Sequence, residues 1–501
     1  MSVHIPRPEY ANALNDWHRT RLALGGRSAI LTDPTQFLPM PESHKRPENR
    51  DLYRLYTERA FWYGGSARTL DAWVGTLTRK PLTVEVPSQF EWRLTNIDGQ
   101  GNDVNYLARQ VVRDVCAYAR IGLLVDIGNA ESASNPRQIP YIATYNNFSI
   151  ISWRTRGTVE GRILDQVVLQ EELEEPHPSG FGVIKEPMYR VLELDENGWY
   201  RARLFVMREG KSLERGEPIY PTRGGAYLNF IPFIFVTPTG TGYEIEKAPL
   251  QDVIDANVSH YQSSADREFS LYWSASPTVV LTGLGEDPNS EGNFTVGSGN
   301  LWKLPTGATA DYLEFSGPGL AAIQETMKDK QQLMASLGAN LLNAPKREAE
   351  TFEALQLKSS GESASLVTIA DAVSKALTAA VKMATYWSYL EYPVKVELNR
   401  DLLNVRLSPE DRKVLMLEYQ SGLLSAEDYY YNLAQGEILR PGVTPEEARD
   451  AAQMQAPLLV SSFRPAPVER EVPVKKVANG DVTPKALTSN VETPKPSRRR
   501  R

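Results

Sequence analysis

Residues Leu250–Trp273 read LQDVIDANVSHYQSSADREFSLYW, and this stretch decides how the rest of the chain is interpreted. Apolar side chains recur along it at helical spacing, at Val253, Ile254, Val258, Tyr261, Ala265, Phe269 and Tyr272. The apolar stripe is narrow, and the other positions are rich in Ser, Asp, Gln and His. A long helix that is polar on most sides usually packs against neighbouring helices or copies of itself. The stretch therefore predicts one long helix with such partners.

The residues after this helix predict a second helix that returns beside it. A compact β insertion runs from Thr278-Val-Val-Leu281 to Leu313-Glu-Phe315 and contains several glycines. Pro318–Ala339 then has helical periodicity. After a loop with the basic pair Lys346-Arg347, favourable residues extend from about Glu350 to Leu390. An apolar stripe from Leu366 to Trp387 makes this the clearest helix in the sequence.

The residues before position 250 change from helical to strand periodicity. Prolines interrupt residues 1–50, where only a short helix near Tyr10–Leu24 is predicted. Helices follow at Leu52–Tyr63, Ala67–Thr78 and Asn105–Arg120, and a buried strand at Gly122–Asp126. Strands are then predicted at Tyr141–Thr144, Ile150–Trp153, Ile163–Leu169, Tyr189–Leu194, Tyr200–Val206 and Phe230–Val236. With a hairpin turn at Asp195–Gly198, this order indicates an α+β fold.

The C-terminal part predicts two more helices and a tail. Ser408-Pro409 and Thr444-Pro445 are helix starts, with a capping residue before proline at the first helical position. Beyond Pro457 no period remains, so we predict a disordered tail that ends in Arg498–Arg501. That basic run fits two interpretations equally: a nucleic-acid or localisation patch, or a tether that only aids solubility.

Charge is unevenly distributed along the 501 residues, whose formal net charge is −7. Residues 462–501 hold ten Lys and Arg against four Asp and Glu. The remaining 45 basic and 58 acidic residues give residues 1–461 a net charge of −13. An acidic body does not grip DNA through a basic face.

The motifs of several enzyme classes are missing from the sequence. No phosphate-binding G-x-x-x-x-G-K-[ST] loop occurs, and no G-x-G-x-x-G joins a strand to a helix. The five histidines are far apart, and the single cysteine, Cys116, lies in a periodic segment that predicts a core position. We therefore expect no enzyme activity, no cofactor and no metal site. The chain shows neither a secretory signal nor a long apolar run, which favours assembly in a reducing cytoplasm.

Three motifs have both a functional and a structural interpretation. Asp287–Gly292 copies the first half of a calcium loop, but the position of the bidentate Glu holds Ser298, so a turn is preferred. The acidic run Glu171–Glu175, followed by His177 and Pro178, is interpreted as a solvated loop. Lys346-Arg347 is either a solvated basic pair or a contact to phosphate groups without base readout.

An ordered set of segments resembles one branch of phage portal-like proteins. Its strings include Arg59-Ala-Phe-Trp-Tyr63, Tyr118–Asp126, Ile150-Ile-Ser-Trp153, His260–Asp266 and Ser276–Gly283, and the likeness covers about Leu52–Leu390. The resemblance implies the portal fold, in which a wing leads into a stem helix, a clip, a second stem helix, a tunnel loop and a long wing helix.

Carried over by segment, the resemblance divides the chain as follows: 1–50 N-terminal arm, 51–247 wing (helical, then β), 248–273 first stem helix, 274–317 clip, 318–340 second stem helix, 341–351 tunnel loop, 352–406 long wing helix and return strand, 407–456 helical crown, 457–501 disordered basic tail.

The same resemblance implies a role for individual residues. Stem packing between subunits would involve Val253, Val258, Tyr261 and Phe269, so a charge at Val258 is expected to block assembly more than folding. Partners would dock on the clip at Leu284, Phe294 and Trp302. Lys346 and Arg347 would face DNA in the channel.

The implied function is that of a portal: a homo-oligomeric ring, usually a dodecamer, at one capsid vertex of a virion. Double-stranded DNA would pass through it without sequence readout, and the large terminase subunit and the head-to-tail adaptor would dock on it. Major capsid and scaffold proteins would surround it. Two other interpretations stay open, namely another virion structural protein such as an adaptor or scaffold, and a metal-dependent nuclease.

Overall fold

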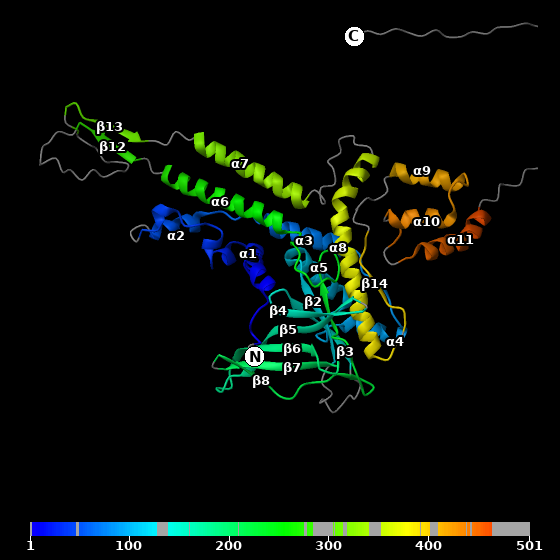
Figure 1. Cartoon of the computed structure of the whole chain (residues 1–501). Helices are drawn as coiled ribbons and strands as arrows, with labels where there is room; N and C mark the ends of the chain where they lie inside the picture. The colour runs from blue at the N-terminus through cyan, green and yellow to red at the C-terminus, as the bar shows by residue number, and fades with distance from the viewer. Residues whose placement is uncertain are drawn as a thin grey trace, which may run out of the picture. The chain divides into compact units, whose positions relative to one another are not determined.

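The computed structural model describes residues 3–46, 50–127, 139–159, 161–208, 210–274, 278–283, 304, 306–313, 318–339, 352–390, 392–400, 409–436, 438–440 and 443–462. The fold is α+β (Figure 1), as the sequence predicts. The chain divides into two compact units, Met1–Leu402 and Leu403–Arg501.

The first unit begins with the helices α1 (Pro8–Ile30), α2 (Arg50–Arg59), α3 (Gly65–Leu77), α4 (Ser88–Glu91) and α5 (Val104–Tyr118). The sequence predicts four of them at nearly the right places and misses the short α4. The helical backbone of α1 is interrupted at Gly26, which has a φ of 75°, so the predicted helix Tyr10–Leu24 matches the part of α1 before this interruption. Cys116 lies in the core, as predicted, and burial raises the pKa of its thiol to about 12.

The β part of this unit contains two larger antiparallel sheets. One has the order β11-β2-β3 and the other β4-β5-β6-β7-β8. The strands are β2 (Ile121–Ile127), β3 (Pro140–Asn146), β4 (Ile150–Thr158), β5 (Gly161–Pro176), β6 (Val183–Leu194), β7 (Tyr200–Arg208), β8 (Lys211–Glu214) and β11 (Phe233–Val236). Short pairs are formed by β1 (Thr83–Glu85) with β14 (Lys395–Glu397) and by β9 (Thr222–Arg223) with β10 (Ala226–Tyr227). Each predicted strand is present.

One local prediction was wrong. Glu171–Glu175 is not a loop but part of β5, where each residue pairs with one of Ile184–Met188 in β6. The acidic run is tolerated in a strand because cations lie opposite it: Arg190 is 2.7 Å from Glu171, and Lys185 is 2.9 Å from both Glu172 and Glu174. The hairpin turn at Asp195–Gly198 is confirmed, with Gly198 at a φ of 80°.

A long helix pair and a third long helix complete the first unit. They are α6 (Gln251–Ser274), α7 (Pro318–Met334) with a π-helical end at Ala335–Ala339, and α8 (Phe352–Trp387). Between α6 and α7 lie the paired strands β12 (Thr278–Thr282) and β13 (Thr309–Leu313). The predicted stripe of α8 is confirmed, since Leu366, Val373, Leu377 and Val381 are buried in the main core.

The second unit contains α9 (Pro409–Gln420), α10 (Ala426–Gln435) and α11 (Pro445–Ser462). The start of α11 is a reciprocal cap, in which Thr444 Oγ1 accepts from the Glu447 backbone N–H and Glu447 accepts from the Thr444 N–H. The sequence prediction missed α10. The prediction of a disordered tail from residue 457 was wrong for its first residues, because α11 continues to Ser462. The remaining residues of the predicted tail, 463–501, lie outside the described residues.

Candidate functional site: the α6–α7 helix pair

Helices α6 and α7 run side by side in the first unit (Figure 1). The apolar stripe of α6 faces the chain's own core: Val253, Val258 and Tyr261 are at most 1% exposed, and Phe269 packs at the edge of the same cluster. Tyr261 contacts Trp62 edge-on, with ring centroids 5.4 Å apart. The side chains of Val253, Val258 and Tyr261 are thus covered without a second subunit. The structure therefore reverses the expectation for Val258: a charge there should unfold the chain rather than block only assembly.

The polar side chains of α6 anchor it to the helices at the start of the chain. Asn257 Oδ1 accepts from the Ser66 backbone N–H at 2.9 Å, and Ser264 Oγ accepts from the Phe61 N–H at 3.0 Å. Two residues further along, Asp266 accepts from the Tyr56 hydroxyl at 2.7 Å. These contacts explain why a helix with so few apolar positions is stable.

A second polar group joins α6 to α7. Lys330 Nζ donates to the Ser259 carbonyl at 3.0 Å and to Ser263 Oγ at 2.7 Å. Beside it, His260 is fully buried, and its Nε2 lies 3.0 Å from the amide nitrogen of Gln331. Burial and the neighbouring Lys330 charge lower the pKa of His260, so the ring is neutral at pH 7.

The π-helical end of α7 is fixed to α3. Trp73 Nε1 donates to the Gly338 carbonyl, and Met334 is buried against Gly65. A side chain at position 338 would overlap Thr69, so glycine permits this close approach. Single π turns inside α-helices are frequent at functional sites. This anchor immediately precedes residues 340–351.

Helix α7 also has an uncovered apolar pair. Leu333 and Leu337 lie one turn apart and are 49% and 41% exposed, whereas Met334 between them is buried. Leucines at i and i+4 form one surface of a helix. The sequence prediction missed this pair, although its spacing was visible.

Several predicted site residues lie outside the described residues: Leu284, Phe294 and Trp302 of the predicted clip, and Lys346 and Arg347 of the predicted tunnel loop. The calcium-like segment Asp287–Gly292 lies outside as well. Their predicted roles stay predictions.

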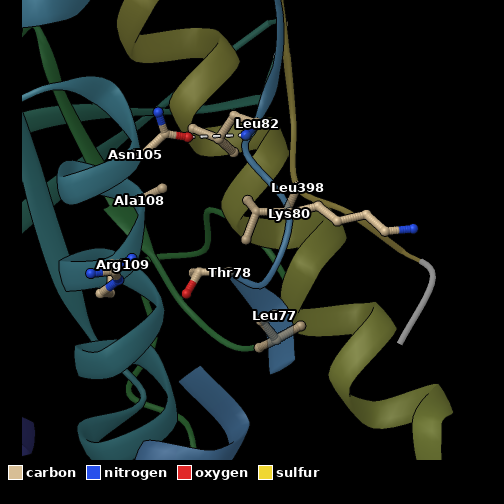
Figure 2. Close-up of a pocket in the computed structure, with 8 residues that line it drawn as sticks. All are labelled: Leu77, Thr78, Lys80, Leu82, Asn105, Ala108, Arg109 and Leu398. Atoms are coloured by element: carbon tan, nitrogen blue, oxygen red, sulfur yellow. Dashed lines mark hydrogen bonds between the residues drawn. The ribbon is translucent and has the colours of Figure 1, made fainter. Parts of the chain in front are cut away.

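A small pocket lies apart from the α6–α7 pair, between α5 and the residues that follow α3. Figure 2 shows the pocket, which has a volume of about 20 Å³, room for a water molecule. Asn105 at its rim accepts from the Leu82 N–H at 3.0 Å.

Within the described ranges no three His, Cys, Asp or Glu side chains gather in a way that could hold a metal ion. None of the helices in those ranges has the length and apolarity needed to cross a membrane.

A protein-family model matches residues 249–388, the stretch that holds α6, α7 and α8, and its description is "Domain of unknown function (DUF4055)". No curated protein matches. Among solved structures, the chain is similar to one titled as the virion of a native gene transfer agent (GTA) particle, with a TM-score of 0.40, 12% identity, and coverage of 74% of this chain and 89% of that one.

Two further solved structures are titled as the neck of an empty GTA particle computed with sixfold symmetry and the neck of a native GTA particle computed with twelvefold symmetry. Their TM-scores are both 0.39, their identities 12% and 13%, and they cover 73% and 74% of this chain and 89% of each neighbour.

Proposed function

We propose that this chain is a structural subunit of a tailed-phage particle, and specifically the subunit of its portal ring. The carrying observation is the antiparallel α6–α7 pair, which is joined through the β12–β13 ribbon and followed by the long helix α8. The portal resemblance of the sequence implies this same order of elements. Fold resemblance alone is an associational argument for function, so the proposal needs a direct test of assembly.

Ring formation is supported by the surface of α7. A monomer that exposes Leu333 and Leu337 on a long helix leaves apolar surface in water, and a neighbouring copy would cover it. The stem interface between subunits would then lie on α7, with Val253, Val258 and Tyr261 supporting it from inside each subunit. We propose a closed ring, with twelve subunits as the working stoichiometry.

The charge of the body suits a channel through which DNA slides. Each ion pair with a phosphate adds binding free energy and so resists sliding. Residues 1–461 carry a net charge of −13, which keeps such contacts few. In this proposal Lys346 and Arg347 supply the sparse cations near the DNA path.

The proposed ring sits at one vertex of the capsid, after assembly in the host cytoplasm. The segment 274–317, with Leu284, Phe294 and Trp302, would dock the large terminase subunit during packaging and the head-to-tail adaptor afterwards. Capsid and scaffold proteins would contact the outside of the ring. The proposed role requires no chemistry from the subunit, hence no cofactor.

Negative-stain electron microscopy of the purified protein, with light scattering on the same sample, tests the proposal. A ring with a central hole and a mass near a dozen times 56.0 kDa is expected. A chain that remains monomeric at high concentration, alone and with scaffold protein, would contradict it. The adaptor and nuclease interpretations would then be tested next, the nuclease by magnesium-dependent DNA cleavage.

A further inference from the structure

Helix α9 of the second unit has apolar side chains that no described part of the chain covers. Four apolar residues follow one another at Val414–Leu417, so they point to all sides of the helix. None of the α9 residues is buried, and Val414 and Leu417 are 55% and 64% exposed. A helix that is apolar on every side is normally enclosed by other elements. Helix α9 therefore lacks a packing partner.

Helix α10 covers only one side of α9, as the two helices lie side by side (Figure 1). Tyr419 of α9 stacks on Tyr429 of α10, with ring centroids 4.6 Å apart. By helical spacing Leu415 lies on the same side of α9 as Tyr419, whereas Val414 and Leu417 lie together on the opposite side. We call the surface formed by Val414 and Leu417 the α9 outer face.

Acidic side chains surround the α9 outer face. Glu410 and Glu418 lie four positions before and after Val414, and Asp411 lies three positions before it, so all three share its side of the helix. The cation next to this group is Lys413, and all four charged side chains are exposed. The α9 outer face therefore suits an apolar segment that carries positive charge.

Three parts of the protein could cover this face: the first unit, the second unit of another copy, and residues 463–501. Residues 1–402 carry a net charge of −9 and residues 403–462 a net charge of −4, so both units are acidic. Residues 463–501 hold ten Lys and Arg against four Asp and Glu, a net charge of +6. Charge complementarity therefore favours the C-terminal segment.

The first part of this segment has both required properties. Residues 463–478 read FRPAPVEREVPVKKVA, with Phe463, four valines and four basic residues. They follow directly on Ser462, the last residue of α11. An extended chain of this length spans about 50 Å. Helix α9 is about 18 Å long, and packed helices lie about 8–10 Å apart. The segment is thus long enough to reach α9 of its own subunit.

We propose that residues 463–478 dock on the α9 outer face of their own subunit. The valine side chains pack on Val414 and Leu417, and the basic side chains lie beside Glu410 and Glu418. The apolar contact supplies most of the binding free energy, and the charges add to it at low salt. This docking goes beyond the proposed portal function, because it takes place within a single subunit and does not require a ring.

Photo-crosslinking on the full chain tests where the segment binds. The photoreactive residue p-benzoyl-phenylalanine replaces Val472, and mass spectrometry maps the crosslinks in an equal mixture of unlabelled and heavy-nitrogen protein. Crosslinks to residues 409–424 of the same copy are expected. Crosslinks mainly to the first unit, crosslinks mainly between copies, or no crosslinks would each overturn the proposal.

A chain truncated after Ser462 should accept the segment as a separate peptide. Fluorescence anisotropy with a labelled peptide of residues 463–478 should show binding to the truncated chain. The full chain should bind it at least about tenfold more weakly, because its own segment competes at an effective concentration near millimolar. Equal binding to both chains would overturn docking within the subunit.

Substitutions in the truncated chain test the apolar contact. Val414→Ser with Leu417→Ser should weaken peptide binding about tenfold or more, since two apolar side chains are lost from the contact. Val159→Ser with Phe181→Ser changes two apolar side chains of the first unit that are 107% and 87% exposed, and should leave the affinity unchanged. Circular dichroism verifies that both variants are folded. Equal affinities of the two variants would overturn the assignment to α9.

The charges have a separate readout. A peptide with glutamine at its four basic positions should bind about tenfold more weakly at an ionic strength of about 0.05 M, where charges are little screened. The native peptide should lose affinity when the ionic strength is raised to about 0.5 M. Binding that responds to neither change would remove the charge complementarity and overturn the choice of residues 463–478.

Discussion

The indole Nε1 of Trp73 donates a hydrogen bond of 3.0 Å to the backbone carbonyl of Gly338, which joins α3 to the π-helical end of α7 across 265 positions of sequence. The bond is buried and lies where Gly338 packs directly against Thr69. The close packing of Gly338 against the buried Thr69 and one buried indole hydrogen bond thus fix the end of the helix pair.

We expect Gly338→Ala to destabilise the chain by about 1–3 kcal/mol, because the added methyl group meets Thr69. Thr69→Ala removes both atoms of the clash beyond Cβ and should recover part of that loss. A double-mutant cycle from urea unfolding measures the coupling. Additive effects of the two substitutions would contradict the contact.

Helix α7 should separate assembly from folding. Leu333→Asp with Leu337→Asp changes two exposed positions, so the fold should persist while ring formation is lost. Val258→Asp places a charge in the core and should cost more than about 3 kcal/mol, unfolding the subunit. Circular dichroism and light scattering distinguish these outcomes. A ring that forms normally with both aspartates would remove α7 from the interface.

The helix pair should weaken in mild acid through His260. Its folded pKa is below the value of about 6.5 that an unfolded histidine has, so the neutral ring stabilises the fold above that pH. This stability is lost as the pH falls through the folded pKa. His260→Gln, which keeps a partner for Gln331, should reduce the loss between pH 7 and pH 5 in thermal melts. An identical pH profile in the variant would contradict the assignment.

Arg120 provides a comparison between charge and volume. It is fully buried over Trp153 and Phe235, and burial lowers its pKa to about 9. Because its charge is desolvated, Arg120→Met should change stability by less than about 1.5 kcal/mol. Arg120→Ala should cost about 2–5 kcal/mol, since it leaves a cavity. Chemical denaturation of both variants measures the difference, and equal losses would show that the charge, not the volume, matters.

The proposed channel contact has a separate test. Lys346→Ala with Arg347→Ala should leave ring formation intact and alter the retention of packaged DNA, because two phosphate contacts per subunit are lost. Electron microscopy checks the ring, and a nuclease-protection assay of filled particles checks retention. If the double variant failed to form rings, the assignment of residues 341–351 to the channel would be contradicted.

The long elements were predictable because each carries an uninterrupted pattern. The bounds of α6 and the stripe of α8 follow from apolar spacing, and β2 from a short apolar run. Helix α10 was missed because three consecutive tyrosines hide its stripe, although Ser425 and Asp428 form a cap that could have located it. The acidic part of β5 was missed because its compensating cations lie on another strand.

In the candidate site, the helices could be predicted from the local sequence, but the contacts between distant segments could not. The narrow stripe of α6 correctly indicated a helix with several partners, but its polar residues gave no sign of which segments they bind. Ser66 and Asn257 are 191 positions apart, and no local pattern links them. The exposed leucines of α7, Leu333 and Leu337, could have been predicted from their helical spacing alone. They lie on a different face of the helix from the buried Met334.

The anchors of α6 also constrain how its sequence can change in length. Asn257, Ser264 and Asp266 each meet a different fixed point near the start of the chain. One inserted residue would rotate everything beyond it by about 100° and advance it by 1.5 Å, which would break the later contacts together. Substitutions within α6 can be accommodated singly, but a gain or loss of residues cannot. Related chains are therefore expected to align through this helix without gaps and to vary in length only outside it.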